Sequence, residues 1–451
     1  MTNFISSQPK LQTGTFFIAV WGCQMNVYDA DRLRDLLSAS GYAEVFDPAQ
    51  AKVVVLITCA VRAKAEDKVF NQIASWQHQG QINEDTVIAL GGCVGAELAE
   101  QIIALDKSVS IVFGPRTAHR LPQMIDRFCA SHLPVVDVTA DALQKFDALP
   151  DPGLRGPSAF ITIMEGCSNK CTYCIVPYTR GAEESRPVQD ILHECLNHLA
   201  QGALELHLLG QNVNSYCGLD ENGEKTSFAS LLYEIAALPG LKRLRFTTSN
   251  PMDFTDDVVR AIGDLEVIAD SIHIPVQSGS DRILQLMHRR YTAQSYLELV
   301  TKLRKVRPQV SISSDFIVGF PGETEEDFAQ TLQLVEAVKF DQSFSFIYSE
   351  RPGTPAAKMT DKVPKEIKQE RIYKLQDLLE ELSAQYSHSY LGTTQEVLVE
   401  GFSRKDCTEL KARSSANRIV VFKGSEKLIG KMVTVKITGV MAHTLKGELL
   451  S

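Results

Sequence analysis

Long apolar segments are missing from this chain of 451 residues, although 44% of its residues are hydrophobic. No run of 18 apolar residues occurs, which argues against a membrane-spanning helix. Residues Met1 to Gly14 have no apolar core of the kind that a secretion signal contains. Because nothing implies export, the ten cysteines are expected in a reducing compartment. These absences predict a cytoplasmic protein.

Positive charge is also scarce, since 46 Lys and Arg residues stand against 55 Asp and Glu residues, for a net charge of −9. This balance argues against a generic nucleic-acid binder, which is usually basic. The charge is unevenly distributed: residues 388–451 carry 10 basic and 6 acidic side chains, whereas residues 151–387 carry 24 and 33. Contact with phosphate is therefore expected at the C-terminal end.

A second paired cysteine or histidine motif is absent, which matters for the one cysteine cluster that is present. Cys167, Cys171 and Cys174 have the spacing Cys-x3-Cys-x2-Cys, with Tyr173 before the last thiol. A structural zinc site usually needs four ligands from two paired motifs, so zinc is the weaker interpretation, and a disulfide is weaker still. Thiolates are soft ligands of iron–sulfur clusters. Three thiolates on a four-iron cluster leave one iron open to a substrate, and the spacing resembles that of radical S-adenosylmethionine (SAM) enzymes.

Two stretches rich in proline and glycine, Leu149 to Pro157 and Arg351 to Pro364, divide the chain. The second leads through a helical pattern into the basic end of the chain. We expect three domains: residues 1–148, residues 149–387 and residues 388–451.

The first expected domain alternates β-branched runs with helical patterns, which is typical of an open parallel α/β sheet. The expected strands are Phe16–Val20, Val53–Ile57, Thr86–Leu90 and Val109–Phe113, and the expected helices are Asp29–Ala39, Arg62–Gln77, Ala96–Ala104 and Thr117–Phe128.

Three of these strands are followed by a cysteine: Cys23, Cys59 and Cys93. Each alone is most simply a small buried hydrophobic residue. Open α/β sheets, however, bind ligands at the carboxyl ends of their strands, so the three thiols are expected to converge as a second cluster site. Two clusters predict about eight irons per chain. The remaining cysteines are interpreted as packing residues: Cys129, Cys195, Cys217 and Cys407.

The second expected domain repeats the β/α pattern about six times, which predicts an incomplete (β/α)6 barrel. Its expected strands are Phe160–Met164, Leu204–Leu209, Arg243–Thr247, Ser271–Pro275, Val310–Val318 and Ser343–Tyr348. In such barrels the chemistry lies in loops after the strands. The cysteine run follows the first strand and Gln211 and Asn212 follow the second. Four arginines are candidates to hold carboxylate or phosphate, or else are surface charges: Arg180, Arg186, Arg289 and Arg290.

The third expected domain has short strands of alternating polarity, which predict a small antiparallel β-barrel. The expected strands are Glu396–Phe402, Arg418–Phe422, Met432–Val440 and Thr444–Leu450. A solubilising cap is the alternative to a phosphate-binding role.

Several motifs closely resemble the methylthiotransferase family of radical SAM enzymes, across nearly the whole chain. They are Gly22-Cys23-Gln24-Met25-Asn26, Thr58-Cys59-Ala60-Val61-Arg62, Gly92-Cys93, Ile163 to Cys167, Val176 to Gly181 and Ser185-Arg186-Pro187. Within the family, the chain resembles members that act on tRNA carrying N6-dimethylallyladenosine beside the anticodon. The C-terminal barrel then resembles a TRAM domain, an RNA-binding module.

This resemblance implies two [4Fe-4S] clusters and SAM, used both as radical source and as methyl donor. Cys167, Cys171 and Cys174 would hold the SAM-binding cluster, and the other three thiols an auxiliary cluster that delivers sulfur to C2 of the adenine. Gln211 and Asn212 would bind the methionine part of SAM, by analogy with other radical SAM folds. The implied partners are the tRNA and a flavodoxin-like or ferredoxin-like electron donor, and we expect a monomer without membrane contact.

The chain departs from the family pattern at two places beside the auxiliary site. Ile57 stands where asparagine is common, and Gly95-Ala96-Glu97 follows Cys93 where a Gln-Arg type of sequence is usual; neither change removes a ligand. The alternatives are family members that methylthiolate threonylcarbamoyl-adenosine in tRNA or an aspartate of a ribosomal protein. A non-enzymatic alternative is an iron–sulfur electron carrier or RNA-binding sensor.

Overall fold

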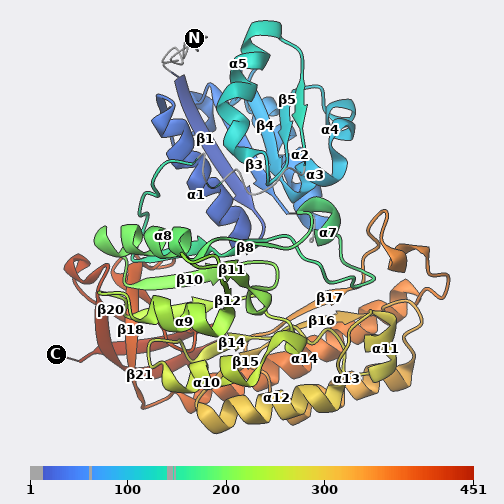
Figure 1. Ribbon diagram of the computed structural model, residues 1–451, viewed down its shortest axis with the longest axis vertical. Coiled ribbons are helices and arrows are strands. Elements are labelled where there is room, and N and C mark those ends of the chain that lie inside the picture. The colour runs from blue at the N-terminus through green and yellow to red at the C-terminus, as the bar shows by residue number, and fades with distance from the viewer. Residues whose placement is uncertain (1–13, 60–62, 140–145, 147–148, 451) are drawn as a thin grey trace. The chain divides into compact units, whose positions relative to one another are not determined.

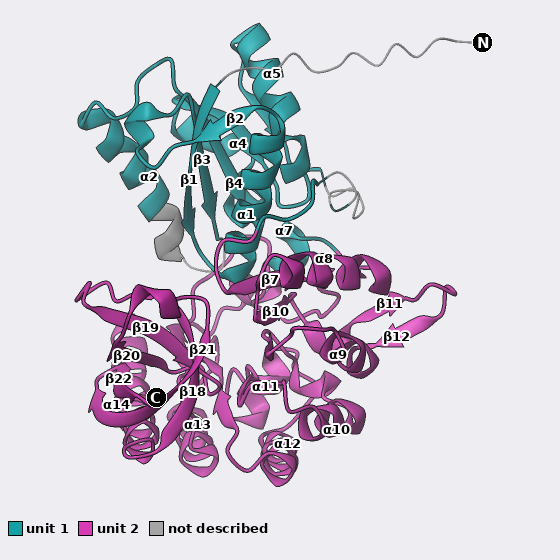
Figure 2. Cartoon of the chain, turned by 90° about the vertical axis from the view of Figure 1, so that its left-hand side faces the viewer, with its two compact units in different colours: residues 1–153, 175–181 teal, residues 154–174, 182–451 magenta. Residues whose placement is uncertain are grey.

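The computed structural model describes residues 14–59, 63–139, 146 and 149–450. The chain forms two compact units (Figure 2): residues 1–153 with 175–181, and residues 154–174 with 182–451. No helix in the described ranges has both the length and the apolar character that crossing a membrane requires. The expected boundary at residue 148 and the segment before residue 14 lie outside the described residues.

Unit 1 contains a six-stranded sheet in the order β2-β1-β3-β4-β5-β6, of which Figure 1 labels β1, β3, β4 and β5. All neighbouring strands are parallel. The strands are β1 (Gly14–Trp21), β2 (Tyr42–Glu44), β3 (Val53–Thr58), β4 (Val87–Gly92), β5 (Val109–Phe113) and β6 (Val135–Asp137). The four predicted strands are confirmed, and the two unpredicted ones are three-residue edge strands.

The central strands β3 and β4 are buried along their whole length because helices cover both faces of the sheet, as is usual for parallel sheets. The helices are α1 (Gln24–Ala39), α2 (Ala63–His78), α3 (Cys93–Leu98), α4 (Glu100–Leu105), α5 (Leu121–Ser131) and α7 (Val176–Thr179). One apolar core packs α1 and α5 against the sheet, and a second packs α2 and α4 against its other face. The predicted helix start at Arg62 lies outside the described residues.

Unit 2 begins with an open barrel wall of parallel strands. They are β7 (Ser158–Thr162), β10 (Glu205–Leu209), β13 (Arg243–Phe246), β14 (Ser271–His273), β15 (Ser311–Ser313), β16 (Asp315–Val318) and β17 (Phe344–Ile347). Strands β13, β10 and β7 are neighbours in that order. A single bridge at Leu244 links β13 to the segment before β14, which pairs with β15. A single bridge at Gln277 links the segment after β14 to β16, which pairs with β17. The predicted strand Val310–Val318 is therefore two shorter strands that are interrupted at Ser314, and the incomplete barrel is confirmed.

Helices cover the outer face of this wall and enclose the largest apolar core of the chain. They are α8 (Val188–Ala200), α9 (Phe228–Ala236), α10 (Asp256–Asp264), α12 (Ala293–Val306), α13 (Glu325–Val338) and α14 (Lys365–Ser389). Residues of the wall alternate between this core and the inner face: Phe316 is fully buried, whereas Phe344 is 55% exposed. The inner face is thus left for a ligand.

The C-terminal segment forms a closed barrel in the order β18-β19-β20-β22-β21. Its strands are β18 (Thr394–Phe402), β19 (Glu409–Ser414), β20 (Ile419–Lys423), β21 (Met432–Met441) and β22 (Thr444–Leu449). Four pairings are antiparallel, as predicted, but β20 and β22 pair in parallel and close the barrel. Strand β19 was not predicted from the sequence.

Buried arginines anchor this barrel within unit 2. Arg243 and Arg245 share the carboxylate of Glu205 and donate hydrogen bonds to four backbone carbonyls of the C-terminal segment, those of Glu396, Arg413, Ser414 and Ser415. Burial acts to raise the pKa of Glu205, but the two guanidinium groups lower it overall. Because Glu205 and Arg243 begin their strands, the C-terminal barrel contacts the wall at the end opposite the cysteine run.

Candidate functional site

The three cysteines of unit 1 follow strands that are direct neighbours in the sheet. Cys23 comes after β1 and caps α1, Cys59 comes after β3, and Cys93 comes after β4 as the first residue of α3. Cys59 and Cys93 are buried and Cys23 is half-buried. The parallel register Trp21–Thr58–Gly92 aligns the three strand ends, so residues separated widely in sequence share one edge of the sheet.

Glycines and Asn26 give the backbone its path through this edge. Gly92 has a φ of +88°, and a Cβ there would lie 2.5 Å from the carbonyl oxygen of Thr58, so a side chain is excluded. The Oδ1 of Asn26 accepts hydrogen bonds from the backbone N and the thiol of Cys23, each at 3.2 Å. The Nδ2 of Asn26 donates to the Thr58 carbonyl oxygen at 3.4 Å. Asn26 thus links two of the three cysteine-bearing loops.

A buried ion pair stands beside these thiols. The Nη2 of Arg180, which follows α7, lies 2.9 Å from Oδ2 of Asp29 on α1, and both side chains are nearly inaccessible. The Nε of the same arginine donates to Sγ of Cys93 at 3.4 Å. A hydrogen bond with Cys59 is the largest cause that lowers the pKa of Cys23 to about 6, with help from the charge of Arg180 and against the effect of burial. The site therefore favours a thiolate at Cys23.

The fully buried Cys93 behaves differently. Burial raises the pKa of its thiol above the usual value, although Arg180 acts in the opposite direction. Burial thus favours the protonated thiol, whereas Arg180 favours the thiolate. Binding of iron displaces the thiol proton and would stabilise the thiolate in this buried position.

The three cysteines of unit 2 lie in the loop that follows β7 and β8 (Met164–Glu165), and all three are half-buried. The loop is fixed by backbone contacts: Cys174 N donates to the Cys171 carbonyl at 3.1 Å, and Thr172 N donates to the Met287 carbonyl at 3.1 Å. Tyr173 packs on a small apolar cluster that contains Met287. The aromatic residue before the last thiol is therefore an anchor of the loop.

The guanidinium group of Arg289 contacts this loop. Its Nη1 lies 3.7 Å from Sγ of Cys171, its Nη2 lies 3.5 Å from the Pro275 carbonyl oxygen, and its guanidinium carbon is 5.6 Å from the ring centre of Tyr291. Its buried Nε has no hydrogen-bond partner among the residues that the structure describes. Within the part of the chain that the structure describes, no carboxylate pairs with Arg289, so its positive charge is uncompensated.

The two residues predicted to bind SAM lie next to the cysteine loop. Gln211 accepts a hydrogen bond from Gly166 N at 2.5 Å through Oε1, and Asn212 donates to Oδ2 of Asp253 at 2.7 Å. Their other polar atoms, Gln211 Nε2 and Asn212 Oδ1, are buried without partners in the described part of the chain, as is Oγ of Ser249 after the next strand. Such atoms are costly unless a ligand satisfies them. These groups fit a ligand with amino and carboxylate groups.

No three His, Cys, Asp or Glu side chains in the described ranges lie close enough to share a single metal ion. Ligands of a four-iron cluster bind different iron atoms and stand farther apart than ligands of one ion. Three thiols without a fourth ligand also suit a cluster with an open iron better than tetrahedral zinc. Each cysteine set thus fits an iron–sulfur cluster by its donor chemistry.

A polar and aromatic group on the inner face of the barrel wall was missed from the sequence. His273 Nδ1 lies 3.0 Å from Oγ of Ser313, and its Nε2 lies 3.4 Å from Oδ2 of Asp315. The ring centre of Phe344 is 6.4 Å from that of His273. The pairing of Asp315 with Phe344 sets them side by side on one face. The strands that carry His273 and Asp315 have only three and four residues, too few for alternating polarity to reveal this face in the sequence.

The remaining candidate arginines and cysteines from the sequence differ in how deeply they are buried. Arg186 is buried and pairs with Glu194 at 2.6 Å, so it is a structural residue rather than a surface charge, whereas Arg290 is exposed. Of the cysteines interpreted as packing residues, Cys195 is buried, but that interpretation is wrong for the three exposed ones, Cys129, Cys217 and Cys407.

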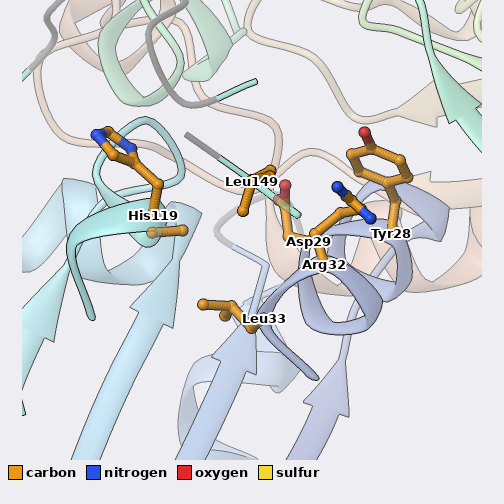
Figure 3. A pocket seen from close by; sticks show the side chains of 7 residues that line it. Tyr28, Asp29, Arg32, Leu33, His119 and Leu149 are labelled. Carbon is orange, nitrogen blue, oxygen red and sulfur yellow. The ribbon is translucent and has the colours of Figure 1, made fainter. Parts of the chain in front are cut away.

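A cavity of about 10 Å³ lies in unit 1 (Figure 3). Tyr28, Asp29, Arg32 and Leu33 of α1 line it, together with Ala118, His119 and Leu149. Its volume is at the lower limit for one water molecule, so it is too small for SAM or a nucleoside.

Three segments of the chain match known protein families. Residues 161–335 match the radical SAM superfamily, residues 15–114 match the uncharacterized protein family UPF0004, and residues 388–450 match the TRAM domain. Among solved structures, the chain resembles the radical SAM methyltransferase TsrM from Kitasatospora setae, with a TM-score of 0.56 and 14% identity over 77% of this chain and 74% of that one. It also resembles the cobalamin-dependent radical SAM enzyme OxsB, with a TM-score of 0.52 and 13% identity over 82% of this chain and 56% of that one. At these identities the likeness concerns the fold alone.

Full-length relatives are much more similar. Proteins from Haemophilus influenzae and Mannheimia succiniciproducens, both named tRNA-2-methylthio-N(6)-dimethylallyladenosine synthase, are 50% identical over 97% of this chain and 93% of their own length. A protein of the same name from Shigella boydii is 49% identical over the same shares. The chain therefore belongs to the tRNA-2-methylthio-N(6)-dimethylallyladenosine synthase family of radical SAM proteins.

Proposed function

We propose that this chain is a radical SAM methylthiotransferase that adds a methylthio group to C2 of N6-dimethylallyladenosine next to the anticodon of tRNA. The observation that carries the proposal is the presence of two separate three-thiol sites at strand ends, in a chain with named relatives at 50% identity over nearly its full length. A C–H bond of an aromatic ring has no leaving group, so the reaction needs a radical, which a cofactor must supply.

Two [4Fe-4S] clusters and SAM are the proposed cofactors. Cys167, Cys171 and Cys174 would hold the SAM-binding cluster, and the three thiols of unit 1, Cys23, Cys59 and Cys93, would hold the auxiliary one. When bound, these groups supply the electron, the radical, the sulfur and the methyl group of the reaction. The chain itself would hold and orient them: Gln211 Nε2 and Asn212 Oδ1, which are buried and have no partner within residues 14–59, 63–139, 146 and 149–450, would bind the methionine part of SAM.

The inner face of the barrel wall is the proposed place of the modified base. Phe344 and Phe346 are 55% and 36% exposed and project on the face that carries His273 and Asp315. An aromatic surface suits both an adenine ring and its branched apolar tail. His273 and Asp315 offer a hydrogen-bonding edge beside it. The same face excludes water from the reacting base once the base is bound.

Residues 388–451 are proposed to hold the tRNA backbone as a TRAM-like domain, after an N-terminal methylthiotransferase domain at 1–148 and a radical SAM domain at 149–387. Four exposed lysines on the barrel make no ion pair with any side chain in the described ranges: Lys423, Lys427, Lys431 and Lys436. Lysines of this kind bind phosphate without reading sequence. A cytoplasmic monomer that receives electrons from a flavodoxin-like or ferredoxin-like protein completes the proposal.

Mass spectrometry of tRNA nucleosides from cells with and without the gene tests the proposal. Loss of the 2-methylthio form together with accumulation of N6-dimethylallyladenosine supports it. An unchanged pair of nucleosides overturns the substrate, and the threonylcarbamoyl nucleoside and the ribosomal aspartate are then measured in the same cells. Absence of any SAM cleavage by the reconstituted protein under a strong reductant favours an electron carrier or RNA-binding sensor instead.

A further inference from the structure

A charge pair is built into the wall of the unit 1 cysteine site. Asp29 and Arg180 are 5% and 2% exposed, and the guanidinium group contacts both the carboxylate and the thiol of Cys93. Charges so far from water are rare in proteins unless they are paired. Replacing the pair by apolar residues is often neutral for stability, so its presence beside three thiols calls for a different explanation.

The surrounding contacts fix where the guanidinium group points. The backbone carbonyl of Arg180 accepts a hydrogen bond from Nε of Arg116 at 2.8 Å. Gly181 follows with a φ of +78°, and a Cβ there would lie 3.1 Å from the Arg116 guanidinium carbon. The backbone that carries Arg180 is therefore held from one side, and Asp29 holds its side chain from the other. Asp29 is fixed in turn by α1, the same helix that Cys23 caps.

We propose that the Asp29–Arg180 pair orients Cys93 and sets the reduction potential of the cluster held by Cys23, Cys59 and Cys93. This inference rests on the proposed function, which places a cluster at these thiols. Asp29 and Arg180 are positioning residues, because they act through Cys93 and through their charges rather than by binding substrate.

The expected direction of the effect follows from charge alone. Reduction adds one negative charge to a cluster, so a nearby positive charge favours the reduced form and a nearby negative charge disfavours it. Arg180 therefore raises the potential, and Asp29 offsets part of this increase. The two halves of one ion pair are expected to have opposite effects, which a purely structural role does not produce.

A variant that can assemble only the unit 1 cluster allows the reduction potential of that cluster to be measured alone. The parent is the full-length protein with three substitutions, Cys167→Ala, Cys171→Ala and Cys174→Ala, reconstituted anaerobically with iron and sulfide. Its iron content is expected to be about four per chain. The potential is then read from the electron paramagnetic resonance signal of the reduced cluster during a redox titration.

Three variants are compared in this parent. Arg180→Gln is expected to lower the ratio of reduced to oxidised cluster at fixed potential by about tenfold, which is 59 mV for a one-electron couple. Asp29→Asn is expected to raise the ratio. Arg180→Lys, which keeps the charge, is expected to stay close to the parent. Arg34→Gln is the matched control, because Arg34 lies on α1, as Asp29 does, and forms ion pairs with Asp31 and Glu44. We expect no shift of the reduction potential in this variant.

Shifts of opposite sign for Arg180→Gln and Asp29→Asn support the inference. Shifts of the same sign, or potentials equal to that of the parent, overturn it. If Arg180→Gln does not assemble a cluster, the reduction potentials of Asp29→Asn and Arg180→Lys test the inference instead. A lower or unchanged potential in Asp29→Asn contradicts the charge argument. A parent that binds no iron through its unit 1 thiols instead overturns the assignment of the cluster and the proposed function with it.

Discussion

Cys167, Cys171 and Cys174 come from one loop of eight residues, whereas Cys23, Cys59 and Cys93 come from three loops after neighbouring strands of a sheet. Each set has an arginine that contacts one of its thiols: Arg289 at 3.7 Å from Cys171 and Arg180 at 3.4 Å from Cys93. The first site is thus defined by a short stretch of chain, and the second exists only when the sheet has formed. Loading of the second site must depend on folding more strongly.

The charges at the two sites also differ. Arg180 is paired with Asp29, while Arg289 contacts a thiol, a carbonyl oxygen and an aromatic ring and forms no ion pair with a carboxylate of the described ranges. An uncompensated positive charge makes reduction easier. This difference suits the proposed roles, in which the cluster proposed at Cys167, Cys171 and Cys174 would accept the electron and the cluster proposed at Cys23, Cys59 and Cys93 would store sulfur.

The largest expected effect separates the two sites completely. Cys167→Ala is expected to abolish SAM cleavage, because the cluster proposed to bind SAM would lose a ligand, while about half of the iron remains. Cys93→Ala is expected to keep SAM cleavage and to abolish methylthiolation of tRNA. Iron analysis and chromatography of 5′-deoxyadenosine and nucleosides measure both. Loss of SAM cleavage in Cys93→Ala contradicts the separation of roles.

Backbone geometry gives the next test of the comparison. Gly92→Ala places a Cβ 2.5 Å from the Thr58 carbonyl oxygen at a φ of +88°, so the edge of the sheet must distort. We expect iron to fall from about eight to about four per chain, with SAM cleavage retained. Gly80→Ala is the control, because Gly80 has a φ of +67° and nothing within 4 Å of the added Cβ. A full iron content in Gly92→Ala shows that the second site tolerates the distortion.

The uncompensated arginine is tested by Arg289→Gln. Removing a positive charge that contacts the thiol of Cys171, a proposed ligand of the SAM-binding cluster, is expected to slow reductive cleavage of SAM about 100-fold, with a more negative potential for that cluster. Arg290→Gln, at the exposed neighbour, is expected to leave the cleavage rate unchanged. Equal rates in the two variants contradict a role for the charge of Arg289.

The difference between the two cysteine sites also explains which of their features could be predicted from the sequence. The contiguous cysteine run was recognised from its spacing, and Cys93 was found because it follows an expected strand, whereas Gly92 was named only in a motif of the family resemblance. The Asp29–Arg180 pair was not predicted, because 151 residues separate its members and neither has a local partner pattern. His273 and Asp315 were missed for a related reason: their strands have three and four residues, too few to show which face each side chain occupies.

A smaller effect is expected at the residues that we propose to bind SAM. Gln211→Ala removes the hydrogen bond to Gly166 N and the unpartnered Nε2, at a cost of about 2 kcal/mol for a bond to a charged ligand. We expect KM for SAM to rise about 30-fold and the potential of both clusters to stay constant. A constant reduction potential indicates that the substitution weakens SAM binding, whereas a changed potential indicates damage to the cysteine loop. An unchanged KM contradicts the assignment of Gln211.

The smallest expected effect concerns the substrate base rather than either cluster. Phe344→Ala removes an exposed ring from the inner face of the barrel wall, and we expect kcat/KM for tRNA with the dimethylallyl group to fall about tenfold, as for loss of an apolar contact. Uncoupled SAM cleavage without tRNA is expected to stay the same. Tyr373→Ala on α14 is the control, because Tyr373 is 59% exposed on a helix that covers the outer face. Comparing tRNA with and without the dimethylallyl group then measures how much of the loss belongs to the tail. A tenfold loss for both tRNAs assigns Phe344 to the adenine ring, and no loss for either removes the inner face from the substrate site.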